Sequence, residues 1–209
     1  MPYQNRVTPF GELERSSARG LMMGNRGILH AEDGSIGVSR WKHKTWIICV
    51  LSFKGRHRRV MSPNRYTELF FLDEAVALAA GHRPCWECRH ADADRFTRAW
   101  RAGNGIAAGT PLRAHDIDET LHPARVDRRR RQIRTRQRIE DLPDGCLIEH
   151  PDHPDTAWLL RNGWLHRWTH GGYRESEKRG TGMVTLLTPV PTMHALRAGY
   201  QPMVHPSAG

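Results

Sequence analysis

Two of the four cysteines, Cys85 and Cys88, lie two residues apart in "GHRPCWECRHAD", and this pair constrains the fold more than any other feature. A short helix is predicted just before it, because Asp73 is a good N-cap and Gly81 occupies the position of a C-terminal stop. The pair has three interpretations: a metal site, a redox centre or two core thiols. A redox pair of the thioredoxin type is expected directly after a strand. The preceding helix therefore favours zinc, bound by two sulfurs of one tight turn.

The stretch "EAVALAAGHRPCWECRHAD", within about residues 70–92, resembles the zinc-binding N-terminal domain of the Ada DNA-repair proteins. The resemblance implies zinc, nucleic-acid binding and a role in DNA repair or damage response. In that family four thiolates hold the ion, two of them from an upstream cysteine pair that also accepts a methyl group from DNA. Here the only upstream cysteine is Cys49, which argues against methyl transfer. The whole chain also resembles an uncharacterised bacterial family with the same "GNRG…LH" and "LRAGY" segments, which adds no chemistry.

The remaining zinc ligands must come from other parts of the chain. We predict the set Cys85, Cys88, Cys49 and His30, because Cys49 lies in a predicted strand and His30 ends the glycine-rich loop before it. Four protein ligands would make a structural site, whereas three would leave a position open for chemistry. The other candidates are His57, His82, His90 and Cys146.

A zinc-dependent nucleobase deaminase is the alternative reading of the same residues. "HAE" at 30–32 and "PCWEC" at 84–88 match the H-x-E…P-C-x-x-C signature, in which His30, Cys85 and Cys88 would hold zinc and Glu32 would move the proton. The context argues against it. Those enzymes begin a helix at H-x-E, but Gly34 and Gly37 interrupt any helix here.

The chain is strongly basic, with 32 Lys and Arg against 22 Asp and Glu, a formal net charge of +10. The basic residues cluster in "KGRHRR" and in "ARVDRRRRQIRTRQR", which predicts contacts with nucleic-acid phosphates. DNA is favoured over RNA because of the resemblance. The other interpretation of such a run is a solvated connector. The predicted phosphate-binding residues are Arg56, Arg58, Arg59, Arg128, Arg129, Arg130, Arg131 and Arg134.

The predicted fold class is α+β: a zinc-clipped N-terminal module followed by a small β-rich C-terminal domain. The predicted divisions are a module over 1–105, a basic connector over 106–141 and the β-rich domain over 142–209. Strands are predicted at 45–53 and 66–72. "TAWLLRNGWLHRWT" predicts a hairpin at Asn162-Gly163, since both turn residues tolerate positive φ. "GMVTLLTP" predicts another strand and "TMHALRAGY" a closing helix.

Several classes of protein are not expected. Four cysteines are too few for a disulfide scaffold, and no apolar run approaches the roughly 18 residues of a membrane span. We therefore expect a protein of the reducing cytoplasm with no membrane partner; the sequence does not predict its oligomeric state. A zinc-stabilised nuclease is a further alternative, based on a scatter of carboxylates and histidines without a recognisable spacing: Asp116, Asp118, Glu119, His122, His166 and His170.

Overall fold

The computed structural model describes residues 1–56 and 59–209 and has an α+β architecture with two sheets. The first sheet is mixed and has the strand order β2-β1-β5-β3-β4-β6. Its strands are β1 (Gln4–Val7), β2 (Leu13–Arg15), β3 (Met22–Asn25), β4 (Ile47–Cys49), β5 (Leu69–Phe71) and β6 (Arg83–Pro84). Two of its pairings, β1 with β5 and β4 with β6, are parallel. These pairings join segments that are far apart in sequence.

The second sheet is antiparallel throughout, in the order β11-β10-β9-β8-β12-β7. Its strands are β7 (Thr135–Arg138), β8 (Leu147–Glu149), β9 (Ala157–Arg161), β10 (Trp164–Thr169), β11 (Gly172–Lys178) and β12 (Met183–Leu186). The predicted hairpin is confirmed: Asn162 and Gly163, both at positive φ, join β9 to β10. The strand predicted in "GMVTLLTP" is β12.

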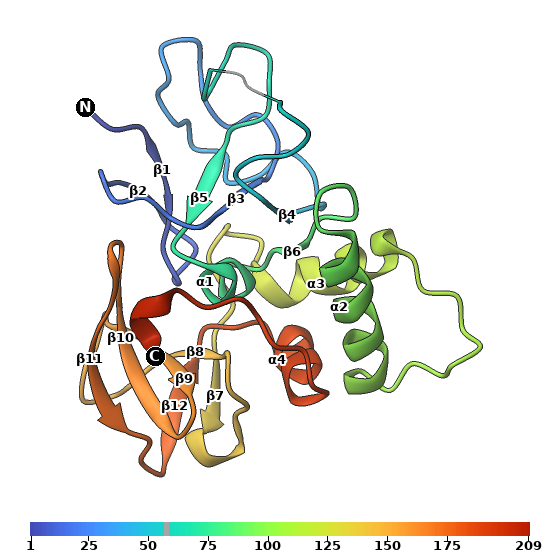
Figure 1. The fold of residues 1–209 in the computed structure, drawn as a ribbon, viewed down its shortest axis with the longest axis vertical. Coiled ribbons are helices and arrows are strands. Elements are labelled where there is room, and N and C mark those ends of the chain that lie inside the picture. Colours follow the sequence, from blue (N-terminus) through green and yellow to red (C-terminus); the bar gives the residue numbers. More distant parts are fainter. Residues whose placement is uncertain (57–58) are drawn as a thin grey trace.

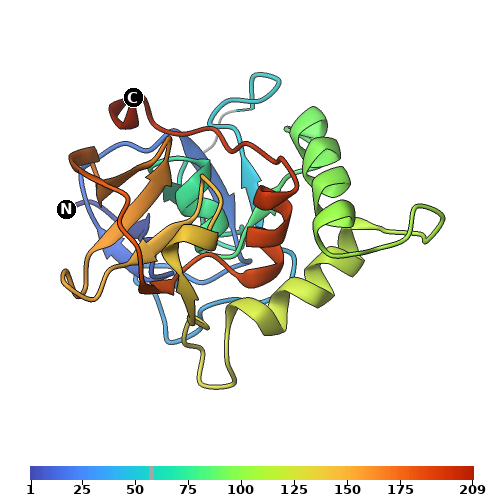
Figure 2. The same cartoon turned by 90° about the horizontal axis from the view of Figure 1, so that it is seen from below.

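The helices are α1 (Glu74–Ala79), α2 (His90–Gly103), α3 (Ala114–Arg125) and α4 (Val190–Arg197), with short 3₁₀ turns η1 (Ile139–Asp141) and η2 (Pro206–Ala208). In Figure 1, α1 lies between the two sheets, while α2, α3 and α4 gather beside them. Figure 2 shows the loop between α2 and α3 projecting from the body of the molecule. Within the described residues, no helix has the length and apolar character needed to cross a membrane.

The central helix α1 follows the sequence prediction closely. Asp73 caps it by accepting a hydrogen bond from the Val76 amide at 2.9 Å, and Gly81 ends it at a φ of +81°. All six helical residues are buried. Buried polar bonds attach this helix to the second half of the chain: the Tyr173 hydroxyl donates to Asp73, and the Tyr200 hydroxyl donates to Glu74. A single cluster of buried apolar side chains includes residues of α1 and of both sheets.

Two regions differ from the sequence prediction. The strand predicted over 45–53 is reduced to β4, because the chain leaves the sheet directly after Cys49. The segment 106–141, predicted as a basic connector, contains α3 and the edge strand β7. The apolar residues of α3 are few, but Ile117 and Leu121 are fully buried. Burial of one narrow face, with a polar and charged remainder, is sufficient to hold α3 in place.

Candidate metal centre

Three cysteine sulfurs come together at one edge of the first sheet. The Sγ atoms of Cys49, Cys85 and Cys88 all lie within 4.8 Å of one another. A tetrahedral zinc ion with Zn–S bonds of about 2.3 Å holds its sulfurs about 3.8 Å apart, so this spacing fits one shared ion. Soft thiolate donors suit zinc among the common metal ions. The part of the chain that the structure describes has no other cluster of this kind.

The parallel register of β4 and β6 explains why Cys49 joins the other two cysteines. Ile48 pairs with Pro84, and the Cys85 amide donates to the Ile48 carbonyl at 2.9 Å. Cys49 ends β4 and Cys85 directly follows β6, so the two lie side by side. The cysteine pair therefore comes directly after a two-residue strand, which the sequence did not predict. Cys88 then comes back toward them through the tight turn that precedes α2, which is closed by the Arg89 amide donating to the Cys85 carbonyl at 3.0 Å.

The turn also supplies hydrogen bonds that favour a thiolate. The Glu87 amide donates to the Cys85 sulfur at 3.4 Å. Contacts with the thiols of Cys49 and Cys88, and then with the turn amides, lower the pKa of Cys85. The same contacts, together with burial, raise the pKa of Cys49. Three thiolates at this spacing repel one another, so all three ionise together only around a cation.

Buried ion pairs fix the elements on either side of the cysteine turn. Arg83 of β6 donates through Nε and Nη2 to the two carboxylate oxygens of Asp118 on α3, at 2.8 and 2.7 Å. Arg89, at the start of α2, pairs with Glu74 of α1 at 2.8 Å. These side chains are at most 5% exposed. The turn that carries Cys85 and Cys88 is therefore held between three helices.

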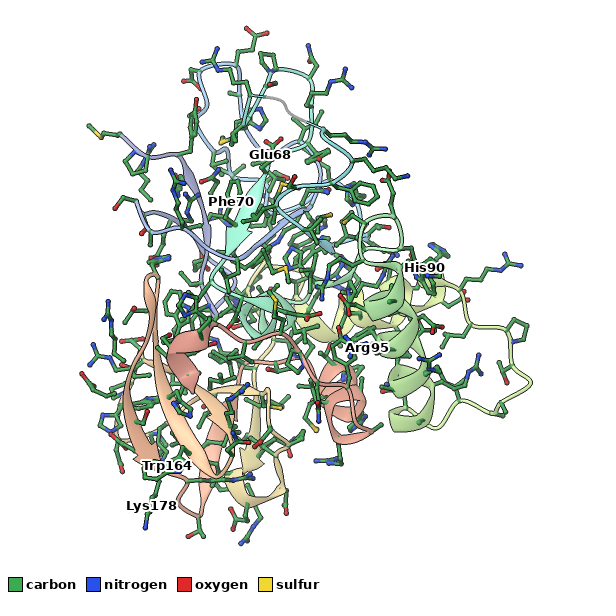
Figure 3. The ribbon with its side chains drawn as sticks, in the orientation of Figure 1. Glu68, Phe70, His90, Arg95, Trp164 and Lys178 are labelled. Atoms are coloured by element: carbon green, nitrogen blue, oxygen red, sulfur yellow. The ribbon has the colours of Figure 1, made fainter. Side chains whose placement is uncertain are left out.

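The three cysteines line a pocket of about 710 Å³, which we call the thiolate pocket. Arginines and carboxylates from distant parts of the chain also line it: Arg6, Arg19, Arg56, Glu68 and Glu87. In Figure 3, Glu68 lies directly before β5 and Phe70 within it, and both residues line the pocket. Trp164 and Lys178 lie at the far end of the molecule, so the second sheet's outer hairpin takes no part in this site.

His30, the predicted fourth ligand, is not in the cluster. Its Nε2 lies 3.2 Å from the Ser62 carbonyl, to which it donates, and its Nδ1 lies 2.6 Å from the Thr67 hydroxyl. Both ring nitrogens are thus engaged, and the imidazole holds two loops together. Glu32 is exposed and also outside the cluster. The structure therefore does not assemble the H-x-E half of the deaminase signature beside Cys85 and Cys88.

The other candidate ligands are also elsewhere. His82 is fully buried and packs edge-on to Phe71, His90 is exposed and contacts Trp86, and Cys146 is fully buried in the second half. His57 lies outside the described residues. The residues of the nuclease alternative do not converge on a metal site: Asp118 pairs with Arg83, while His166 and His170 belong to or adjoin the second sheet.

The predicted phosphate-binding arginines fall into two groups. Arg56 lines the thiolate pocket, stacks near Phe53 and pairs with Glu87 at 2.7 Å. Arg59 is exposed, and Arg58 lies outside the described residues. The second group occupies the turn after α3 and the start of β7. All five of its members are exposed: Arg128, Arg129, Arg130, Arg131 and Arg134.

Several pocket residues were missed by the sequence analysis. Arg6 reaches the pocket because β1 pairs with β5 in parallel, which places its guanidinium 4.7 Å from the centre of the Phe70 ring. No local sequence pattern predicts the pairing of two strands that lie more than sixty residues apart. Glu68 could have been noticed in the sequence, since a carboxylate directly before the apolar strand "LFF" is unusual. In the structure its side chain is buried and accepts a hydrogen bond from the Met61 amide at 2.7 Å.

Comparison of the chain with protein-family models, with curated proteins and with solved structures gives no match. The resemblance to the Ada zinc domain thus depends on the short segment around Cys85 and Cys88 alone. Functional inference depends on the site itself.

Proposed function

We propose that this protein binds one zinc ion through Cys49, Cys85 and Cys88 and uses the adjoining pocket to bind nucleic acid, with DNA favoured over RNA. The observation that carries the proposal is the position of the three sulfurs at the wall of a large pocket that also holds arginines. A pocket of this volume accommodates a ligand of nucleotide size. A role in DNA repair or damage response follows from the Ada resemblance.

The charges around the pocket favour a phosphate-bearing ligand. Arg6, Arg19 and Arg56 outnumber the two carboxylates, Glu68 and Glu87, and Arg19 and Arg56 are exposed. Arginine binds phosphate oxygens through paired N–H groups, and binding of this kind weakens steeply as salt rises. The exposed arginines of 128–131 extend the basic surface of the protein. Their contacts would be with the backbone, because nothing in their arrangement reads a base edge.

The test combines metal analysis with DNA binding. Purified protein should contain one zinc per chain, and a labelled DNA duplex should bind much more weakly at 200 mM than at 50 mM salt. The double variant Arg19→Gln/Arg56→Gln should weaken binding at least about tenfold and make the salt dependence shallower. Arg174→Gln removes an exposed charge from β11 and serves as the control. Absence of zinc under reducing conditions, or DNA affinity that is flat with salt, would refute the proposal.

A second candidate, hydrolytic deamination of a nucleobase, is favoured by one observation. Three cysteines would leave one of the four ligands of a zinc ion to come from another source, and all three cysteines line the pocket. Zinc held there would supply Lewis-acid activation of water. The deaminase signature assigns proton transfer to Glu32 and a zinc ligand to His30. In this proposal the buried Glu68 transfers the proton, and Cys49 takes the place of His30 as a ligand. Ammonia release from a cytosine- or adenine-containing oligonucleotide that is lost in Glu68→Gln, but kept in Glu32→Gln, would establish this activity.

A further inference from the structure

Two arginines are buried against a single tryptophan at the base of β4. Arg26 and Arg125 are 2% and 1% exposed, and their guanidinium carbons lie 4.2 and 3.9 Å from the centre of the Trp46 ring. Arg26 follows β3 and Arg125 ends α3, so the fold brings together two like charges almost a hundred residues apart. Gly81 makes room for this arrangement: a Cβ there would lie 2.6 Å from the Arg125 Cδ.

Neither arginine has a carboxylate partner among the described residues. Arg83 and Arg89, which are also deeply buried, each pair with an acidic side chain. Among residues 1–56 and 59–209, by contrast, no carboxylate oxygen forms an ion pair with Arg26 or Arg125, and Glu12 and Asp118 act on them only at longer range. Burial lowers the pKa of both guanidinium groups to about 9. Buried charges are otherwise paired in proteins, because an unpaired one loses its hydration without compensation.

Some donors of these two groups are also unused. Arg26 donates to the Gly11 carbonyl and to His82, and Arg125 donates to the carbonyls of Gly81 and Lys44. Arg26 Nη2 and Arg125 Nε are buried and have no hydrogen-bond partner within the described part of the chain. His82 only accepts a hydrogen bond from Arg26: burial and then Arg26 hold its pKa well below the usual value, so its ring is neutral, and an imidazole supplies no negative charge.

Both arginines line a narrow cavity that is separate from the thiolate pocket. Trp46 also lines it, Arg40 and Arg130 add two further positive charges, and Glu12 is the acidic residue in its wall. The free space in the whole cavity is about 20 Å³, which admits one atom of the size of an oxygen. A tetrahedral oxyanion would therefore place one oxygen in the cavity and keep the others outside it, where the exposed Arg130, which donates to the Val38 carbonyl, lines the wall.

We propose that this cavity is an oxyanion site, bounded by Arg26, Trp46 and Arg125 with Arg130 at its mouth, and that its ligand is a phosphate group. Buried paired N–H donors are suited to phosphate. The group comes from a nucleic-acid backbone or from a free phosphate species. The site does not depend on the thiolate centre, and it gives Arg130 a role other than solvation.

Thermal unfolding in inorganic phosphate tests the site directly. About 10 mM phosphate, compared with chloride at equal ionic strength, should raise Tm by about 5 °C if the ligand binds only the folded state. Arg26→Met should lose this rise while keeping its zinc content and far-UV circular dichroism. General stabilisation by phosphate as a solute would persist in Arg26→Met. An equal rise in the parent and in this variant would therefore overturn the proposal.

Two variants at the surface keep the test decisive if Arg26→Met does not fold. Arg130 and Arg174 are both exposed, but of these two only Arg130 lines the cavity. Arg130→Gln should reduce the phosphate-dependent rise, whereas Arg174→Gln, which removes the same charge from β11, should leave it intact. Equal behaviour of these two variants would contradict the site.

A DNA-binding arm distinguishes the two sources of phosphate. If the ligand is a backbone phosphate, Arg26→Met should also weaken binding of a DNA duplex about tenfold, and inorganic phosphate should compete with the DNA. If the ligand is a free phosphate species, the thermal shift depends on Arg26 but DNA affinity does not change. Both results support an oxyanion site. A phosphate-dependent shift that is independent of Arg26 and Arg130 refutes it.

Discussion

The two sheets of this protein are stabilised by different means. The second sheet consists of antiparallel strands joined mainly by short turns, and β9, β10 and β11 have five to seven residues each. The first sheet has strands of two to four residues and includes two parallel pairings between distant segments. Its long loops, residues 26–46 and 50–68, contain neither helix nor named strand in their described parts. In the second sheet β8 to β11 pair between consecutive strands, although β12 returns to pair with β8 and β7. The first sheet has shorter strands and two parallel pairings, so it depends more on contacts of another kind.

Buried ion pairs supply such contacts in the first half, and a metal ion on the three cysteines would add to them. Cys49 ends β4, while Cys85 and Cys88 follow β6, so an ion bound by all three joins two strands and the start of α2. The only cysteine of the second half, Cys146, is fully buried, and burial raises its thiol pKa. The same residue type thus has two different environments. We expect metal removal to affect the first sheet much more than the second.

The largest effect should follow from loss of the cysteine pair. Cys85→Ser/Cys88→Ser should abolish zinc binding and destabilise the first half by about 5 kcal/mol or more, since binding energy at such sites is folding energy. Hydrogen exchange should show lost protection in β3, β4 and β6, with β9 and β10 still protected. Cys146→Ala is the control and should keep full zinc content. Equal loss of protection in both sheets would contradict the difference between them.

Shortening a core side chain in the second sheet should lower stability without loss of zinc. Leu159 of β9 is fully buried, and Leu159→Ala should cost about 3 kcal/mol in the free energy of unfolding, measured by urea denaturation. Zinc content should stay at one per chain, because the cavity forms far from the thiolates. Loss of zinc in this variant would show that the two halves are more tightly coupled than we expect.

A smaller, matched comparison uses two glycines with nearly the same backbone conformation. Gly81 and Gly163 have φ values of +81° and +79°, but a Cβ at Gly163 would meet nothing within 4 Å, whereas one at Gly81 would strike Arg125. Gly163→Ala should cost about 1 kcal/mol from backbone strain alone. Gly81→Ala should cost about 2 kcal/mol more in chemical denaturation. Equal losses of unfolding free energy in the two variants would mean that the Arg125 side chain moves aside freely.

How much of this structure the sequence predicts depends on whether a feature is local. The α1 helix and the hairpin at Asn162-Gly163 were predicted correctly, because caps and turn residues act over a few positions. The pairings of β1 with β5 and of β4 with β6 could not be predicted, since they depend on how distant segments pack. Helix α3 was missed because its buried face is narrow.

The candidate site shows the same division. Cys85 and Cys88 are close in sequence, and Cys49 was predicted to join them as the only upstream cysteine; the structure brings all three together. His30 was predicted as a zinc ligand from its place in the sequence, yet its two ring nitrogens are hydrogen-bonded to the Thr67 hydroxyl and the Ser62 carbonyl. The buried arginine pair left no sequence signal, because Arg26 and Arg125 meet only through the packing of both around Trp46.

The most direct test of the thiolate centre is zinc K-edge X-ray absorption on the purified, reduced protein. The predicted spectrum has three sulfur scatterers at about 2.3 Å and one lighter oxygen or nitrogen scatterer at about 2.0 Å. This result would place one ion on Cys49, Cys85 and Cys88 with its fourth position open to the pocket. Four sulfur scatterers, or a protein that contains no zinc, would contradict the account.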